Sequence, residues 1–335
     1  MYYVKQKTFY MFTGIYWKPL SDTAEELLKL FVNDGSSDQQ FNVYLWSAFK
    51  AEEKDFTEEE ADKIRKRIKE LEKDGGRQSI LKSVRTICAE TNTIEWNANK
   101  NMFAFTDVIL NLKTVDVSPP HPKQYINETC GFPWLDTFHG YSEEEMKEAQ
   151  QFVRQFVYSL TENEEMTAYL FRMMASWLHG TNIVEKAYFF LGEGGNGKGT
   201  LTTLLHRAFG NYYRDLKLEY YTTLPKSSDA PDSNLHNISN ARIVNTSEVA
   251  SGHEKGEVFL DAPYKRLVGD PVSARKAHGK DTVRFKAGNI IIQCNAMPKF
   301  KGTNEVRFLF SPPPPFFSVT HCRSLPFSFD RTYWR

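Results

Sequence analysis

The feature that most constrains the fold of this chain is a glycine-rich segment between an apolar run and an amphipathic run. AYFFL, over residues 187–191, has the length and composition of a short buried strand, and TLTTLLHRAF, over residues 200–209, has apolar residues at helical spacing. Between them stands GEGGNGKG, residues 192–199. A strand, a glycine-rich loop and a helix in this order predict a phosphate-binding loop, because loop N–H groups and the helix N-terminus converge on one anion.

We expect this loop to hold the phosphates of ATP, with Lys198 reaching the β- and γ-phosphates. The residues expected to contact the nucleotide are Gly192, Glu193, Gly194, Gly195, Asn196, Gly197, Lys198, Gly199 and Thr200. Gly199 departs from the usual pattern, in which a hydroxyl follows the lysine and binds Mg²⁺. Either Thr200 takes that role, or phosphate oxygens and water hold the ion. The alternative is a glycine-rich turn with an exposed lysine.

Two later segments have the features of the other half of a nucleotide site. ARIVNTSEVA reads as an apolar strand that ends near Glu248, a carboxylate placed to orient an attacking water and to contribute to the metal site. KAGNIIIQCNAMP places Asn295 at the exit of a buried strand, where its amide could touch the γ-phosphate. Each residue has a plainer interpretation, because Glu248 could be a surface glutamate and Asn295 a turn residue.

The change in periodicity near residue 180 predicts a domain boundary. After it, strands alternate with helices, which is typical of an α/β protein with a parallel sheet. Before it, the sequence predicts a mixed, mostly helical domain over residues 1–180, with a turn at Gly14, strand and loop over 94–135, and a charged helix over 51–74 that Gly75 and Gly76 end. Ser142 with Glu145 and Thr161 with Glu164 have the spacing of capping boxes at the starts of two helices.

Composition excludes several classes of protein. The 42 basic and 42 acidic residues balance, so no net charge draws the chain toward nucleic acid or membrane. The 4 cysteines are far apart and form no C-x-x-C pair, which argues against a zinc ribbon or a disulfide framework. No apolar run is long enough to cross a bilayer. These features favour a soluble protein of a reducing intracellular compartment, without a membrane partner.

Four motifs in order resemble a known family. GEGGNGKGT, RIVNTSE, YKRLVGDPVSARKAH and IIIQCNAMPKF are similar to the A, B, B′ and C motifs of superfamily 3 helicases. More narrowly, they resemble the poxvirus-type primase-helicases of large DNA viruses and the related phage and plasmid primases. Upstream, FYMFTGIYW and NMFAFTDVILNLKT resemble the domain that precedes the motor in this family. The likeness covers about residues 1–305.

The resemblance implies a P-loop NTPase domain of the AAA+-like type over residues 181–305, acting as an ATP-driven homo-oligomeric ring, a hexamer, on single-stranded DNA. In that family's terms Lys198 would hold the phosphates, Glu248 would be the catalytic carboxylate and Asn295 would sense the γ-phosphate. A viral protein of this kind would work at the replication site of the host cell. No primase active site is recognisable, so a primase would be a separate module or partner.

A local excess of basic residues lies over residues 265–286, and it suits a hairpin that grips a DNA backbone. Lys276, His278 and Lys280 are the candidates for its tip. A solvated basic loop is the alternative. Two departures from the family pattern remain: Ser247 stands where an aspartate commonly precedes the glutamate, and residues 306–335 form an irregular, proline-rich tail in which Arg307 is the nearest candidate arginine finger.

Three functions therefore stay open. The first is a DNA-translocating ATPase, the second a P-loop kinase for a small molecule, and the third a DNA-binding or assembly module without catalysis. A kinase would need a lid and an acceptor pocket, for which the sequence has no signature. The third function is favoured by the altered motif positions and the irregular tail.

Overall fold

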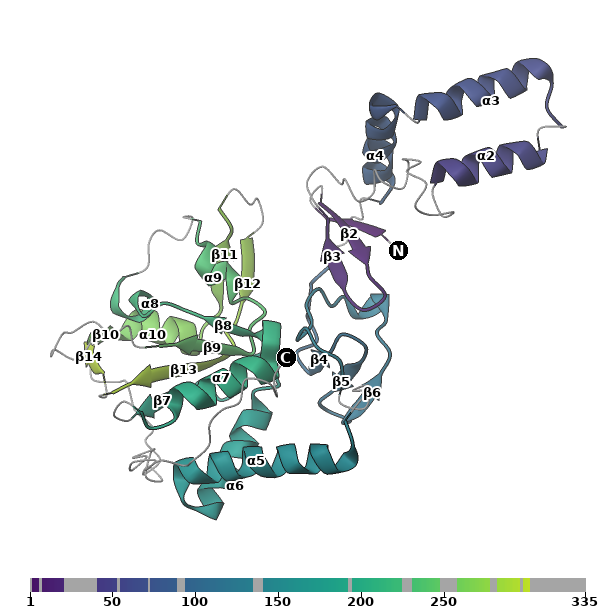
Figure 1. The fold of residues 1–335 in the computed structure, drawn as a ribbon. Helices are drawn as coiled ribbons and strands as arrows, with labels where there is room; N and C mark the ends of the chain where they lie inside the picture. The colour runs from purple at the N-terminus through teal and green to yellow at the C-terminus, as the bar shows by residue number, and fades with distance from the viewer. Residues whose placement is uncertain are drawn as a thin grey trace. The chain divides into compact units, whose positions relative to one another are not determined.

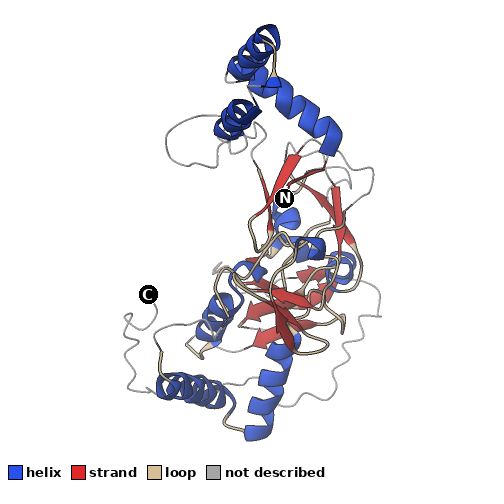
Figure 2. Ribbon diagram, turned by 90° about the vertical axis from the view of Figure 1, so that its right-hand side faces the viewer, coloured by secondary structure: helices blue, strands red, loops and turns tan. Residues whose placement is uncertain are grey.

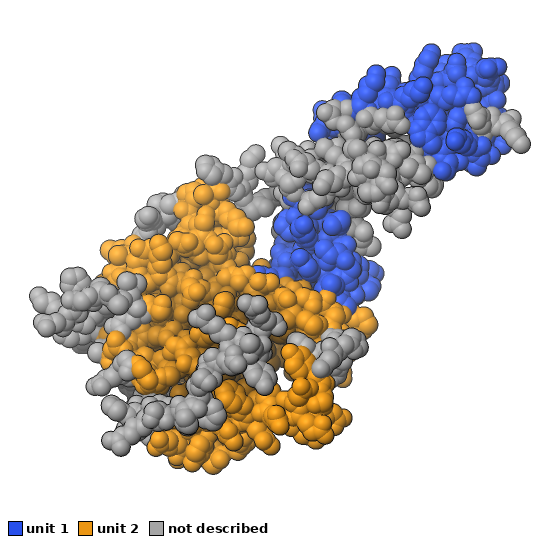
Figure 3. Space-filling view, viewed as in Figure 1, with its two compact units in different colours: residues 1–98, 120–128 blue, residues 99–119, 129–335 orange. Residues whose placement is uncertain are grey.

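The computed structural model describes residues 2–5, 8–20, 41–52, 55–71, 73–88, 94–134, 141–191, 195–224, 231–247, 258–277, 282–295 and 298–301. The chain divides into two compact units, which Figure 3 shows in different colours. Unit 1 comprises residues 1–98 and 120–128, and unit 2 comprises residues 99–119 and 129–335.

Unit 1 contains a small antiparallel sheet of three strands in the order β1-β2-β3. The strands are β1 (Tyr2–Lys5), β2 (Thr8–Phe12) and β3 (Trp17–Pro19). Gly14 has a φ of 99° in the turn between β2 and β3, a conformation that glycine adopts without strain, so the predicted turn is confirmed. The Trp17 indole is buried and donates to the Pro122 carbonyl oxygen of the same unit at 2.8 Å.

Three helices complete the described part of unit 1: α2 (Phe41–Glu52), α3 (Glu58–Leu71) and α4 (Asp74–Cys88). Ala61 and Ile68 of α3 are buried with Phe49 of α2, whereas the charged residues of α3 are exposed except for Arg65, which is half-buried over the Phe49 ring. The predicted single helix over 51–74 is wrong in its bounds. Residues Gly75 and Gly76 lie in the first turn of α4 rather than ending a helix, because a helix start tolerates residues of low helical propensity.

Unit 2 begins with a second antiparallel sheet, which agrees with the strand-and-loop character predicted for this region. Its strands are β4 (Met102–Ala104), β5 (Ile109–Asn111) and β6 (Asp116–Ser118), paired in sequence order. The 3₁₀ helix η3 (Pro122–Gln124) follows within the segment that returns to unit 1.

Two helices precede the parallel sheet: α5 (Glu143–Thr161) and α6 (Glu164–Ser176). The Ser142 capping box is confirmed, since the Ser142 hydroxyl accepts from the Glu145 N–H and the Glu145 carboxylate accepts from the Ser142 N–H. The Thr161 capping box is wrong. Thr161 is the last residue of α5, and Asn163 caps α6 by accepting from the Met166 N–H at 2.9 Å.

The centre of unit 2 is a four-stranded sheet in the order β7-β13-β9-β8, in which every neighbouring pair is parallel (Figure 1). Its strands are β7 (Ala187–Leu191), β8 (Tyr213–Asp215), β9 (Ile243–Thr246) and β13 (Asn289–Cys294). All four carboxyl ends therefore lie at one edge of the sheet. This edge is where ligands bind in open parallel sheets.

The remaining elements connect or flank this sheet (Figure 2). The helices are α7 (Lys198–Phe209), the 3₁₀ helix η5 (Gly210–Tyr212), α8 (Glu219–Thr222), α9 (Ser233–Asn237) and α10 (Asp261–Val268). Two further strand pairs are present. The parallel pair is β10 (Val258–Leu260) with β14 (Lys299–Lys301), and the antiparallel pair is β11 (Val272–Arg275) with β12 (Thr282–Phe285).

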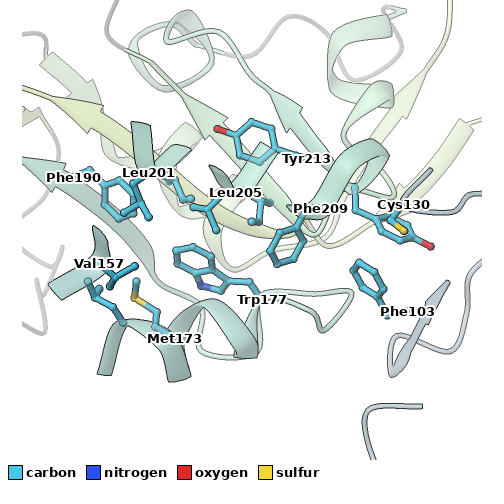
Figure 4. Packing of buried hydrophobic residues seen from close by; sticks show 14 of the residues in the cluster. Phe103, Cys130, Val157, Met173, Trp177, Phe190, Leu201, Leu205, Phe209 and Tyr213 are labelled. Carbon is cyan, nitrogen blue, oxygen red and sulfur yellow. The ribbon is translucent and has the colours of Figure 1, made fainter. Parts of the chain in front are cut away.

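A hydrophobic core lies on each face of the parallel sheet. On one face Ile243 and Ile291 pack with apolar residues of α5, α6 and α7; on the other, Val244, Ile290 and Ile292 pack with residues of α8, α9 and α10. Figure 4 shows Trp177 between Val157 and Met173 on one side and Leu205 and Phe209 of α7 on the other. Trp177 is fully buried at the C-terminal end of α6.

The first core also joins segments on both sides of the boundary expected near residue 180. Phe103 and Leu110 of the second antiparallel sheet, Val157 of α5 and Trp177 share one cluster with Leu201 of α7. Packing thus groups residues 99–119 and 129–180 with the parallel sheet, whereas the sequence placed them in a preceding domain.

Candidate phosphate site

The loop after β7 leads into α7 through two glycines with left-handed backbone conformations. Gly195 has a φ of 81° and Gly197 a φ of 86°. Residues that carry a Cβ atom rarely adopt such φ angles, which explains glycine at both positions. Gly197 is the N-cap of α7 and supplies no side-chain cap. The predicted order of strand, loop and helix is confirmed for the described residues, whereas Gly192, Glu193 and Gly194 lie outside them.

The structure brings together two residues that the sequence assigned to one site from motifs far apart. Lys198 is the first residue of α7, and its Nζ donates to Oδ1 of Asn295 at 3.4 Å. Asn295 directly follows β13 and is exposed. Since β13 is the neighbour of β7 in the sheet, the lysine and the amide meet where these two strands end.

Asn196 tests whether the loop fits an anion. Its side chain is 6% exposed, and its Oδ1 accepts from the Lys198 N–H at 3.4 Å. Its Nδ2 is buried and has no hydrogen-bond partner among the described residues, which leave out 192–194 of the same loop. A buried donor without an acceptor is costly, and one beside a helix N-terminus and a lysine suits an oxygen of a phosphate. The residues present therefore fit the phosphate chain of a nucleotide.

Gly199 leaves room at the helix start. A Cβ built at Gly199 has no atom within 4 Å, and the residue is in an ordinary helical conformation. Neither packing nor backbone geometry requires glycine there. Thr200, the alternative source of a hydroxyl for Mg²⁺, is exposed one residue further along α7.

Leu160, in the last turn of α5, packs against the loop at Gly197. A Cβ built at Gly197 would lie 2.5 Å from Cδ2 of Leu160, which is itself buried. The Leu160 side chain therefore packs directly against Gly197, and a side chain at position 197 would have to displace it. The sequence did not predict this contact.

Glu248 is the predicted catalytic carboxylate. Glu248 lies outside the described residues, and Ser247, just before it, is exposed at the end of β9. The assignments of Glu248 to catalysis and of Thr200 and Glu248 to a metal site therefore stay predictions. Arg307 and the tail over 306–335 also lie outside the described residues.

The basic segment forms a hairpin from β11 and β12, as the DNA-binding prediction requires. Lys276 follows β11 and is exposed, whereas His278 and Lys280 lie outside the described residues. Lys265 pairs with Asp261 at 2.9 Å, and Lys286 pairs with Glu185 at 2.8 Å. These two cations are thus partly neutralised, and the described basic residues on the hairpin itself are Arg275, Lys276 and Arg284.

Sequence reasoning missed a polar chain across the same sheet edge. Gln293 Nε2 donates to Asn245 Oδ1 at 3.0 Å, and Asn245 Nδ2 donates to Asp215 Oδ1 at 2.8 Å. The signal was present in RIVNT and IIIQC, since each strand carries one amide among apolar residues. Burial raises the pKa of the neighbouring Tyr213 phenol, and the Asp215 charge adds to that rise.

Fold and site together define a mixed α/β protein with a parallel sheet, a glycine-rich loop at the carboxyl edge of that sheet and a lysine at the following helix N-terminus. Among the described helices, none is both long and apolar enough to cross a bilayer.

Comparison with known proteins agrees with the resemblance that the motifs predicted. Residues 1–158 match the family model described as "D5 N terminal like". A protein of Acanthamoeba polyphaga mimivirus named "Putative helicase L207/L206" is 22% identical over 308 residues, which cover 90% of this chain. The chain spans 31% of the length of that relative. The likeness to viral primase-helicases is thereby confirmed.

Solved structures with local similarity include two from the C-terminal region of NrS-1. The apo structure of that region has a TM-score of 0.35 and 18% identity, covering 46% of this chain and 36% of the other. The A form apo structure has a TM-score of 0.31 and 21% identity, covering 45% and 34%.

Proposed function

We propose that this chain contains the motor domain of a helicase of viral DNA replication, together with the domain that precedes it, and that it hydrolyses ATP with Mg²⁺ and moves along single-stranded DNA as a homo-oligomeric ring. The observation that carries the proposal is the contact of Lys198 with Asn295 beside the buried donor of Asn196. Each of the three comes from a motif that the sequence assigned to one phosphate site. The mimivirus relative, named as a helicase, supports the choice of a motor over a kinase.

The roles of the described residues follow from their chemistry. Lys198 and the first turn of α7 neutralise phosphate charge, and Asn196 donates to a phosphate oxygen. Asn295 offers its amide to Lys198 or to the γ-phosphate, so it can report whether that group is present. Bound Mg²⁺ would neutralise charge that develops on the phosphates. Glu248 would orient the attacking water, and the hairpin that carries Lys276 would bind the DNA backbone.

The whole-protein activity and its partners are part of the proposal, because the chain corresponds to less than a third of its mimivirus relative. A primase module or partner, hexameric assembly and a soluble location at a replication site all follow from the same likeness.

The test compares ATP turnover of the wild type and Lys198→Ala, with and without single-stranded DNA. Lys147→Ala, which changes an exposed lysine of α5, is the matched control. We expect DNA to stimulate the wild type and the control, and Lys198→Ala to lose at least about a hundredfold in turnover, as expected for removal of a transition-state contact. Normal turnover in Lys198→Ala would disprove the site.

One other function has an observation in its favour. Ser247 contributes no charge at the end of β9, and Gly199 contributes no hydroxyl to the helix start. A wild-type chain that binds ATP without turnover, even with DNA, would identify a binding or assembly module. Turnover that DNA leaves unchanged but a small acceptor stimulates would identify a kinase.

A further inference from the structure

The chain of side-chain hydrogen bonds from Gln293 through Asn245 to Asp215 runs across three neighbouring strands, β13, β9 and β8. Asn245 is its centre and is only 5% exposed. Its amide is fully oriented, because Oδ1 accepts from Gln293 and Nδ2 donates to Asp215. The three residues are named here the amide relay.

The relay occupies one position on one face of the sheet. Residues two apart in a strand point to the same face, so Asn245 shares its face with Ile243, and Gln293 shares its face with Ile291. Both isoleucines are fully buried in the core that α7 covers. The face is therefore apolar under the body of α7 and polar at its two ends, with Asn289 at the amino end of β13 and the relay at the carboxyl end.

Holding the sheet together does not require these polar residues. Backbone ladders already pair β13 with β9 and β9 with β8. Asn245, the buried member of the relay, is a polar residue at a position that an apolar residue could fill, and replacing hydrogen-bonded polar partners by apolar groups of the same shape can be nearly neutral. The presence of a polar residue at the buried position 245 is more readily understood if the relay acts on the residues that follow it in the chain.

Those residues belong to the candidate site. Two positions after Gln293 comes Asn295, whose Oδ1 lies 3.4 Å from Lys198 Nζ. Two positions after Asn245 comes Ser247, which precedes the predicted carboxylate. The relay thus ties together the side chains at the carboxyl ends of β9 and β13, two positions before each chain reaches Ser247 or Asn295.

We propose that Asp215, Asn245 and Gln293 are positioning residues for nucleotide hydrolysis. They act through the strand ends, holding Asn295 and the exit of β9 in the orientation that the hydrolytic step needs, and they leave nucleotide binding to the loop and Lys198. Because an amide that accepts and donates at once polarises its neighbours, the Asp215 carboxylate also strengthens Gln293 Oε1 as an acceptor. The inference rests on the proposed function.

The experiment measures ATP affinity by calorimetry and DNA-stimulated kcat for the full chain. Asn245→Leu and Gln293→Met each break the relay with little change in volume. We expect each to lower kcat about tenfold, within the range for loss of a buried hydrogen bond, and to change Kd for ATP less than about twofold. The double variant should be no slower than the slower single variant, since both changes break one chain.

Two variants of Asp215 separate the effect of losing a hydrogen bond from the effect of disturbing the sheet. Asp215→Asn keeps an acceptor oxygen and should stay within about threefold of the wild-type kcat, whereas Asp215→Ala should match Asn245→Leu. Both act at an exposed strand end and should fold even if Asn245→Leu does not.

Asn289→Leu is the matched control, because Asn289 is buried at the opposite end of β13 and donates to the Arg242 carbonyl oxygen at 3.1 Å. It should lower stability without lowering kcat. The inference is overturned if Asp215→Ala and Gln293→Met keep the wild-type kcat, if Asn289→Leu loses as much as they do, or if Kd weakens in proportion to kcat. Normal relay variants together with an inactive Lys198→Ala overturn this inference alone, whereas a wild type without turnover overturns the proposed function as well.

Discussion

Replacing Gly197 by alanine should destabilise the protein for two separable reasons. The residue has a φ of 86°, and a left-handed conformation costs an ordinary residue about 1–2 kcal/mol. The new methyl group would also lie 2.5 Å from Leu160 Cδ2, closer than a carbon contact allows, and overpacking of this kind costs about 1–3 kcal/mol. We expect Gly197→Ala to lower the free energy of unfolding by about 3 kcal/mol.

A double-mutant cycle with Leu160→Ala separates these two terms. Leu160→Ala alone removes a buried side chain and should cost about 3 kcal/mol. In that background the methyl at position 197 meets no leucine, so only the cost of the left-handed backbone remains. The double variant should therefore be about 1.5 kcal/mol more stable than the sum of the singles predicts.

Urea unfolding followed by far-UV circular dichroism gives each free energy, provided that the slopes with denaturant agree. Gly199→Ala is the control, since its Cβ has open space and its backbone is helical. It should be neutral or stabilise by up to about 1 kcal/mol. If the losses of unfolding free energy for Gly197→Ala and Leu160→Ala were additive, direct packing of Leu160 against position 197 would be refuted.

Three further outcomes are expected. Gly199→Ser restores a hydroxyl in open space, so ATP affinity should depend more strongly on Mg²⁺, which a magnesium titration at fixed ATP measures. Arg242→Met removes the buried donor to the carbonyl oxygens of Leu178, Met102 and Lys100, of which Lys100 keeps a bond from the Gly180 N–H, and should cost about 3 kcal/mol in urea unfolding. Arg242→Lys should recover less than half of that loss because lysine lacks the planar fork. Burial raises the pKa of the Cys130 thiol to about 11, so native Cys130 should resist alkylation at pH 8 in peptide mapping, and its contribution to stability should be lost as pH rises from about 9 to 11.

The parts of the fold that the sequence predicted are those that depend on neighbours in the chain. The order of β7, loop and α7 follows from apolar periodicity and from glycines at 195 and 197 that the backbone requires. The Ser142 cap follows from residues three apart. In both cases the interaction that decides the structure lies within one turn or one loop.

The parts that the sequence did not predict depend on competition or on pairing. Thr161 has the spacing of an N-cap, but Asn163 is the N-cap of α6 because its side chain accepts from the Met166 N–H. The relay needs the register of β9 with both of its neighbours, which no single strand contains. The contact between Leu160 and Gly197 likewise joins a helix end to a loop residue 37 positions later in the chain.

The course of the chain between the two units limits how the protein can be dissected. It enters unit 2 at residue 99, returns to unit 1 for residues 120–128 and enters unit 2 again. No single cleavage point separates the two units. An expressed fragment that began at residue 181 would lack Val157, Met173 and Trp177, and the apolar side of α7 would then face water. Such a fragment should aggregate, and limited proteolysis between residues 119 and 129 should give pieces that remain associated.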